Sequence, residues 1–186
     1  MNFFEKTTET NTIYKGKIFN VQQNKVLLKN GNFSSREVIK KQNAACIVAL
    51  TKTKKIVMVK QFRYAINRHL LEIPAGKIET FEKHPIICAK RELLEETGYK
   101  AKKWINLGPI FPCPGFCNEK LFLFLAINAF KAQNPTPDPD EFLQTVILPF
   151  KLAIVQAAMG NLHDAKTSCA ILKLHALTQL RKMQLN

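Results

Sequence analysis

Acidic residues are scarce in this chain of 186 residues, which has 14 Asp and Glu against 28 Lys and Arg and a formal net charge of +14. Such a charge favours an anionic partner, such as a nucleotide, a nucleic acid or an anionic surface. The lysines are scattered and do not form runs, so an ordinary solvated surface explains them at least as well. No helix-turn-helix, zinc-finger or aromatic RNA-binding signature is present, which argues against a nucleic-acid-binding module.

The chain also lacks a paired cysteine framework and a long hydrophobic run. Its five cysteines are odd in number, and no second pair completes a zinc site with Cys113 and Cys117. This usage predicts a reduced, cytoplasmic compartment. The apolar segment 121–130 is too short to cross a bilayer, and residues 1–7 lack the basic and apolar regions of a secretory signal. We therefore expect a cytoplasmic protein with no membrane association.

The pattern along the chain predicts two parts. Residues 1–42 read as a small antiparallel β subdomain, with strands at 12–19, 20–28 and 34–39 and a hairpin turn at Asn30-Gly31. A sheet of that size is marginal alone, so it needs a partner surface from the rest of the chain or from a second subunit. Residues 43–186 begin with a buried strand at 45–50 and follow the order strands, helix, strands, helices. This order predicts an α/β domain with a mixed sheet between helices, the helices lying at about 85–97, 149–159 and 165–183.

The helix predicted at 85–97 carries the most informative pattern. Pro85 suits the first helical turn, and Gly98 suits the left-handed position just past the end. Between them, three carboxylates are spaced i, i+3 and i+4 and lie on one face: Glu92, Glu95 and Glu96. Clustered carboxylates repel one another, which favours a bound hard cation such as Mg²⁺. An ordinary acidic helix surface is the alternative for this face alone.

The wider string around this helix resembles the signature of the Nudix hydrolases. That signature runs Gly, five residues, Glu, seven residues, Arg-Glu, an aliphatic residue, any residue, Glu-Glu, any residue, Gly and an apolar residue. Its second half is intact at 91–99, and Glu82 follows Gly76 at the family spacing. Eight residues instead of seven separate Glu82 from Arg91, and Phe81 stands where relatives commonly have glycine. The flanking segments 58–63, 71–76, 114–116 and 163–167 are similar to those of the ADP-ribose pyrophosphatase branch.

The resemblance implies a Nudix α/β/α sandwich and a metal site. Its metal ligands would be Glu92 and Glu96 with Glu95 assisting, together with the backbone carbonyl of Ala75. The ion would be Mg²⁺, with Mn²⁺ as an alternative. We expect Arg91 to orient the neighbouring glutamates by charge-assisted hydrogen bonds.

The general base is expected outside the helix. In similar enzymes it lies on an acidic loop late in the chain, which matches residues 138–141 here. Glu141 or Asp140 is the candidate on that loop, and Glu119 competes with them. All three catalytic glutamates of the helix would then remain with the metal.

The resemblance also implies an anionic substrate and its contacts. Arg63 is the first choice to grip a phosphate, because a guanidinium binds it bidentately, and Arg36 is the second, with an exposed strand charge as the even alternative. Glu72 and Gly115 are further substrate contacts by resemblance. The expected reaction is hydrolysis of ADP-ribose to AMP and ribose 5-phosphate by a homodimer whose residues 1–42 form the dimer contact. Rival interpretations are a nucleotide sugar or an RNA 5′ end as substrate, or a Nudix protein that senses a nucleotide without cleaving it.

Overall fold

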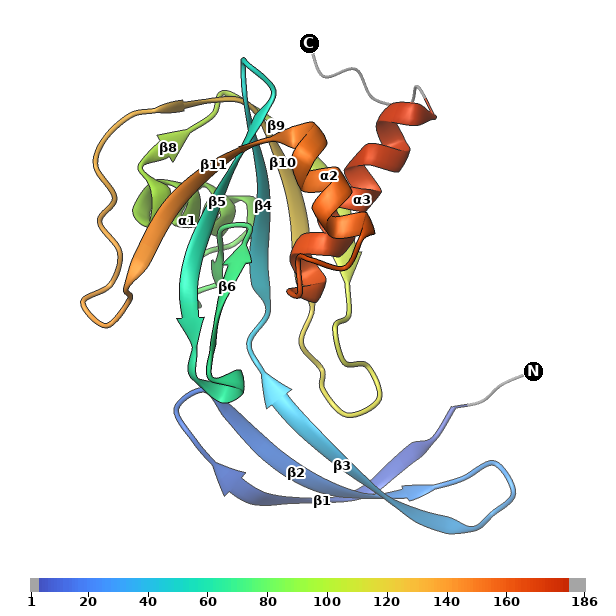
Figure 1. Ribbon diagram of the computed structural model, residues 1–186. Coiled ribbons are helices and arrows are strands. Elements are labelled where there is room, and N and C mark those ends of the chain that lie inside the picture. The colour runs from blue at the N-terminus through green and yellow to red at the C-terminus, as the bar shows by residue number, and fades with distance from the viewer. Residues whose placement is uncertain (1–3, 181–186) are drawn as a thin grey trace. The chain divides into compact units, whose positions relative to one another are not determined.

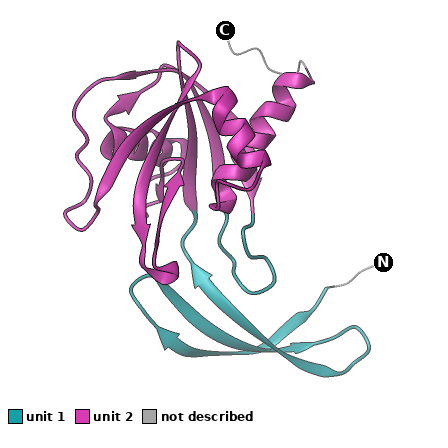
Figure 2. Ribbon diagram, viewed as in Figure 1, with its two compact units in different colours: residues 1–43, 111–120 teal, residues 44–110, 121–186 magenta. Residues whose placement is uncertain are grey.

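The computed structural model describes residues 4–180, which fold into two compact units (Figures 1 and 2). The first unit takes in the chain up to residue 43 together with residues 111–120. The second takes in residues 44–110 and the chain from residue 121 onward. Each unit has its own sheet and is described by itself. No helix in the described part of the chain is long and apolar enough to span a membrane.

The first unit is built on a three-stranded antiparallel sheet in the order β1-β2-β3. Its strands are β1 (Lys6–Lys15), β2 (Phe19–Leu27) and β3 (Phe33–Lys41). The predicted turn at Asn30-Gly31 joins β2 to β3. Gly31 has a φ of 84°, which residues other than glycine rarely adopt. The loop 111–120 is fastened to β3, because the N–H of Ile39 donates to the carbonyl of Phe116 over 2.7 Å.

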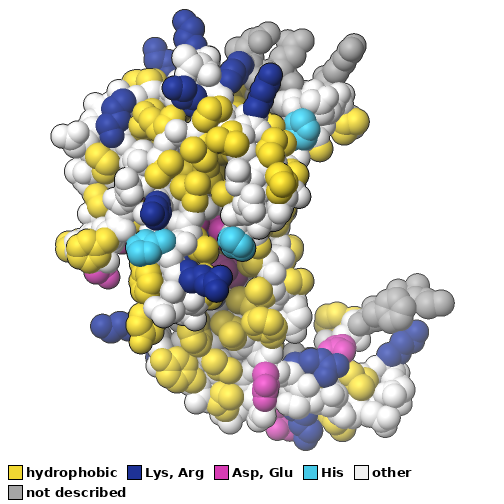
Figure 3. Space-filling view, in the orientation of Figure 1, with side chains coloured by type: hydrophobic (Ala, Val, Ile, Leu, Met, Phe, Trp, Pro, Cys, Tyr) yellow, Lys and Arg dark blue, Asp and Glu magenta, His cyan; other side chains and the backbone are white. Residues whose placement is uncertain are grey.

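The first strand differs from the sequence prediction. β1 ends at Lys15, and residues 16–18 form a turn in which the N–H of Gly16 donates to the carbonyl of Phe19 over 3.1 Å. All ten residues of β1 are exposed, so no alternation of apolar residues marks the strand in the sequence. Hydrophobic side chains are also visible on the surface of this unit in Figure 3. The large exposed ones in the described part of this unit are Phe4, Ile13, Tyr14, Ile18, Phe19, Phe33, Phe111 and Phe116.

The second unit is built on an eight-stranded mixed sheet. Its central path runs β11-β5-β4-β10-β8, with β6 paired to β5, β7 to β4 and β9 to β10. Only β4 and β10 pair in parallel among these strands. The strands are β4 (Ala44–Thr51), β5 (Lys55–Arg63), β6 (Arg68–Glu72), β7 (Ala75–Lys77), β8 (Tyr99–Lys100), β9 (Lys103–Ile110), β10 (Leu121–Lys131) and β11 (Leu143–Pro149).

Helices cover both faces of this sheet. They are α1 (Pro85–Thr97), α2 (Phe150–Ala158) and α3 (Ala165–Gln179), with a short 3-10 turn, η1 (Tyr64–Ile66), between β5 and β6. Figure 1 shows α1 on one side and α2 and α3 on the other. α1 has the predicted bounds, whereas α3 ends at Gln179, and residues 181–183 of the longer prediction lie outside the described residues.

The central strand β4 shows why this sandwich forms. Ala45, Ile47 and Ala49 pack with the apolar face of α1. The alternate residues of β4 pack with α2 and α3 on the opposite side: Cys46, Val48 and Leu50. Since successive side chains of a strand point to opposite faces, a strand that is apolar throughout needs cover on both. The predicted α/β/α sandwich is confirmed.

Candidate active site

α1 positions the carboxylates that the sequence singled out. Ala89 and Leu93 are fully buried against the sheet, which fixes the rotation of the helix. Gly98 ends it with a φ of 71°, and its N–H donates to the carbonyl of Leu94 over 2.7 Å. With that rotation the side chains of Glu92 and Glu96 are also buried, at 9% and 4% exposure. A charged group this deep in a protein requires a partner.

Arg91 is a shared partner of the glutamates around it. Its Nη1 donates to Glu92 over 2.7 Å and to Glu95 over 3.0 Å, and its Nε donates to Glu82 over 2.9 Å. Glu82 has a fully buried side chain, and it also accepts from the N–H of Glu79 over 2.8 Å. The longer loop therefore still brings Glu82 to Arg91. Burial alone would raise the pKa of Glu82, but the Arg91 hydrogen bond and charge bring that pKa below its ordinary value.

The backbone of strand β7 contacts both buried glutamates. The N–H of Ala75 donates to Glu96 Oε2 over 3.2 Å. A Cβ on Gly76 would collide with the carboxylate of Glu92, so that carboxylate lies directly against the backbone of Gly76. Glycine is required there by close approach and not by an unusual φ. Cys88 of α1 reaches the same strand, where its thiol donates to the carbonyl of Lys77 over 3.2 Å.

A third carboxylate, that of Glu141, acts on the same pair. The pKa of Glu92 is raised to about 7, chiefly by burial; Arg91 opposes the rise, and the charges of Glu95 and Glu141 add to it. Burial also raises the pKa of Glu96 well above its usual range, with Glu92 and Glu141 adding to the shift. Glu141 is an exposed residue, yet partial loss of solvation and the charges of Asp138 and Asp140 raise its pKa. Glu92 and Glu96 are thus two buried carboxylates whose repulsion is not balanced by nearby positive charge, and the charge of the exposed Glu141 adds to it.

This donor set fits a hard divalent cation. Oxygen ligands on buried carboxylates that repel one another are what Mg²⁺ and similar ions bind. Within residues 4–180, no three His, Cys, Asp or Glu side chains form a ready-made metal cluster. Glu95 differs from Glu92 and Glu96, since its side chain is 41% exposed and is paired with Arg91. Glu92 and Glu96 are therefore the two side chains best placed to hold an ion.

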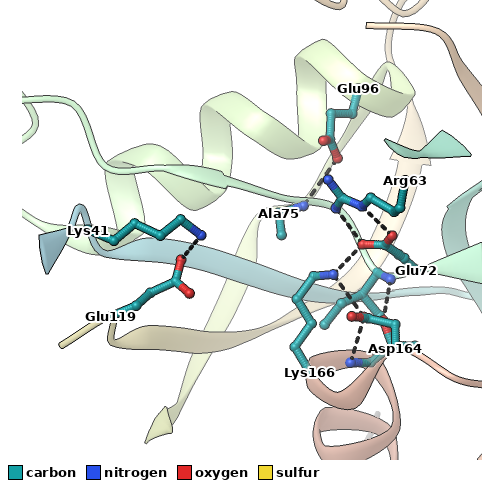
Figure 4. A network of polar contacts seen from close by, with 10 residues as sticks. Lys41, Arg63, Glu72, Ala75, Glu96, Glu119, Asp164 and Lys166 are labelled. Carbon is teal, nitrogen blue, oxygen red and sulfur yellow. Dashed lines mark hydrogen bonds and ion pairs between the residues drawn. The ribbon is translucent and has the colours of Figure 1, made fainter. Parts of the chain in front are cut away.

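A second polar network lies beside Glu96, as Figure 4 shows. Glu72 is 1% exposed, and its two oxygens accept from Arg63 Nε over 2.7 Å and from Arg63 Nη2 over 2.6 Å. Lys166 of α3 also donates to Glu72, and it donates to Asp164 over 2.8 Å. The structure therefore pairs Arg63 and Glu72, which the sequence had proposed as separate substrate contacts.

Sequence reasoning assigned no role to Lys166 or Asp164. The signal was present, since segment 163–167 belongs to the resemblance, but its residues carried no chemistry until the fold placed them beside Glu72. Asp164 caps α3 by accepting from the N–H of Thr167 over 3.1 Å. The hydroxyl of Thr167 in turn accepts from the N–H of Ile73 over 2.9 Å. The start of α3 is thus fastened to the segment between β6 and β7.

The remaining candidate residues have different surroundings. Arg36 of β3 makes a bidentate pair with Glu5, through Nε over 2.9 Å and Nη2 over 2.6 Å. Glu119 is paired with Lys41 over 2.5 Å, while Gly115 lies in the exposed loop 111–120. All of these lie in the first unit. Asp140, in the second unit, is exposed, and its charge acts on Glu141.

Comparison with known proteins identifies the family of the chain. The family model for the NUDIX domain matches residues 40–170. The chain is 38% identical to an ADP-ribose pyrophosphatase of Bacillus subtilis, over 96% of this chain and 97% of that protein. It is 36% identical to a methanol dehydrogenase activator of Bacillus methanolicus, over 91% of each. It is 32% identical to a GDP-mannose pyrophosphatase of Salmonella arizonae, over 75% of this chain and 77% of that protein.

A solved structure described as an ADP compounds hydrolase shares the fold, with a TM-score of 0.83 and 17% identity, over 97% of this chain and 98% of that one. The chain therefore belongs to the Nudix family. Within that family it is similar to the ADP-ribose pyrophosphatases, and the prediction of a Nudix hydrolase is confirmed.

Proposed function

We propose that the protein hydrolyses the pyrophosphate bond of ADP-ribose in a Mg²⁺-dependent reaction that yields AMP and ribose 5-phosphate. The observation that carries this proposal is the pair of buried carboxylates, Glu92 and Glu96, beside β7, with the charge of Glu141 acting on both. Two buried carboxylates that repel each other, with Arg91 and Arg63 nearby, suit a cation and an anionic substrate. Similarity to ADP-ribose pyrophosphatase over nearly the whole chain supports the choice of substrate.

Each residue of the site has a proposed role in the reaction. Glu92 and Glu96, with the carbonyl of Ala75, would hold the ion, while Arg91 keeps Glu95 and Glu82 in place around them. A bound divalent cation polarises phosphoryl oxygens and lowers the pKa of a water molecule. Glu141, whose pKa is raised, accepts the proton of the water that attacks phosphorus. The phosphoanhydride P–O bond then breaks to release the two monophosphates. The charge of Asp140 contributes to the raised pKa of Glu141.

The experiment that tests this proposal is a substrate panel. The purified protein is incubated with ADP-ribose, GDP-mannose and a 5′-triphosphorylated RNA, with Mg²⁺ or Mn²⁺ and with EDTA, and the products are separated by chromatography. We expect release of AMP from ADP-ribose that stops in EDTA. Turnover of ADP-ribose that persists in EDTA, or no turnover of it at all, would contradict the proposal.

A nucleotide sugar is the second candidate substrate. Similarity to a GDP-mannose pyrophosphatase favours it, because that relative aligns with three quarters of this chain. Cleavage of GDP-mannose at a higher kcat/KM than ADP-ribose in the same panel would make it the preferred substrate. Ligand binding without cleavage of any compound would instead favour a nucleotide sensor.

We also propose that the protein is a cytoplasmic homodimer whose residues 1–42 make the dimer contact and contribute Arg36 to the substrate. The exposed hydrophobic side chains of the first unit support this, because a small sheet with exposed Ile13 and Phe33 gains from a covering surface. Five free cysteines are consistent with a reducing compartment. Light scattering on a sizing column should give about twice the 21.2 kDa of one chain, and a mass of 21.2 kDa would contradict the dimer.

A further inference from the structure

The Arg63 guanidinium is hydrogen-bonded along one edge only. Glu72 takes Nε and Nη2, whereas Nη1 makes none of the hydrogen bonds found among residues 4–180. Figure 4 shows the Arg63 side chain between Glu72 and Glu96. The pKa of Arg63 is raised first by its hydrogen bonds to Glu72 and also by the charges of Asp164 and Glu96, so both of these acids lie within electrostatic reach. Arg63 therefore borders the carboxylate group with one N–H edge to spare.

Lys166 determines how much of the Arg63 charge is left for a ligand. The network holds two cations, Arg63 and Lys166, and two anions, Glu72 and Asp164, so it is neutral as a whole. Lys166 lies between both carboxylates, and its side chain is 12% exposed. Without Lys166, Arg63 would be the only cation for two buried or half-buried anions. Its spare edge would then be attracted to Asp164 and away from the active site.

We propose that Lys166 is a positioning residue for substrate binding: by balancing Glu72 and Asp164, it leaves the free edge of Arg63 available for a phosphate of the substrate. Lys166 itself does not touch the substrate. This inference rests on the proposed function, because it requires a substrate with a diphosphate, but it does not depend on which nucleoside diphosphate derivative is cleaved.

The test is a charge-balance cycle at two positions. Lys166→Met removes the ammonium and leaves an excess of one negative charge, and Lys166→Met combined with Asp164→Asn restores neutrality. Asparagine remains a good N-cap, so the second change spares the start of α3. Lys166→Arg keeps the charge, and Lys173→Met removes a charge from the same helix two turns away. Thermal unfolding of every variant reports on the fold separately.

Binding of ADP-ribose is measured by calorimetry in EDTA, and KM and kcat are measured with Mg²⁺. We expect Lys166→Met to weaken binding and raise KM roughly tenfold or more, with little change in kcat, because a charge-assisted contact to the substrate is lost. The double variant should recover most of the lost affinity. Lys166→Arg and Lys173→Met should bind like the original protein.

Two outcomes would overturn the inference. If Lys166→Met binds ADP-ribose as tightly as the original protein, Lys166 has no part in binding. If the double variant is as weak as Lys166→Met, Lys166 only fastens α3 to Glu72 and its charge is not the cause. If Lys166→Met does not fold, Lys166→Arg and the double variant still decide between balance and fastening. A protein that cleaves only GDP-mannose would overturn the proposed substrate, and the same variants measured with GDP-mannose would decide the role of Lys166.

Discussion

Two groups of buried carboxylates lie side by side in the second unit, and they differ in their partners. Glu72 accepts from both Arg63 and Lys166, and although burial opposes them, these cations lower its pKa. Glu92 and Glu96 are also buried, yet their pKa values are raised, because burial and neighbouring acids outweigh Arg91 at Glu92, and outweigh the Ala75 N–H and Lys166 at Glu96. Burial alone therefore does not decide the direction in which the pKa of a carboxylate shifts. The balance of nearby charge decides it.

The largest effect should come from removing the charge of Glu96, one of the two buried carboxylates whose pKa is raised. Glu96→Gln keeps the shape of the side chain and removes its charge, so a metal-dependent reaction should slow by about 10²–10⁴-fold. The thermal unfolding temperature should hold or rise, because an ionised Glu96 is unfavourable in the metal-free protein. Steady-state kinetics and calorimetry measure both quantities. Glu95→Gln on the exposed side of α1 should have the smaller kinetic effect, and equal losses would contradict the distinction between them.

A smaller loss of activity should follow when the carboxylate of Glu92 is displaced without a change in charge. Gly76→Ala places a methyl group where the Glu92 carboxylate now lies, so that carboxylate must move. A shift of about 1 Å at a catalytic group can cost on the order of 10²-fold in rate. Circular dichroism should show an unchanged fold. Full activity in Gly76→Ala would mean that the position of Glu92 against β7 is not important for the reaction.

The two groups should respond to pH with opposite signs in the metal-free protein. The raised pKa of Glu92, about 7, means that the folded state binds a proton more tightly than the unfolded chain. Its contribution to stability is therefore lost between about pH 4.5 and 7 as pH rises, with a magnitude on the order of 3 kcal/mol. The lowered pKa of Glu72 gives the reverse, a contribution present above the unfolded pKa and lost as pH falls through the folded one. Denaturant unfolding from pH 3 to 8 measures both slopes, and Glu92→Gln should flatten only the upper one.

The smallest effect should come from an exposed pair. Lys25 and Glu9 on the sheet of the first unit lie 3.2 Å apart, with side chains 48% and 70% exposed. Such pairs contribute little, so Lys25→Met should change the free energy of unfolding by no more than about 0.5 kcal/mol. Urea unfolding of Lys25→Met is compared with that of Glu72→Ala. Glu72→Ala should lose more stability, because it leaves Arg63 and Lys166 without their buried partner. Comparable losses in the two variants would contradict the importance of burial.

The sequence predicted some parts of the molecule to the residue and others not at all. α1 was found with the correct bounds because Pro85 and Gly98 are local signals that act within one turn. β1 was misplaced because its exposed residues carry no periodic pattern, so long-range pairing with β2 decides its conformation. The part played by Lys166 could not be read from the chain, since it lies 94 residues from Glu72 and only the fold brings the two together.

The thiol of Cys88 has a practical consequence for labelling the protein. Burial on the inner face of α1, with the nearby charges of Glu92 and Glu82, raises its pKa to about 12, so it stays protonated and unreactive at neutral pH. Cys113 and Cys169 are exposed, and they lie in different units. Maleimide dyes should therefore attach to these two sites before any reaction at the helix. One fluorophore could then be attached to each unit without any mutation.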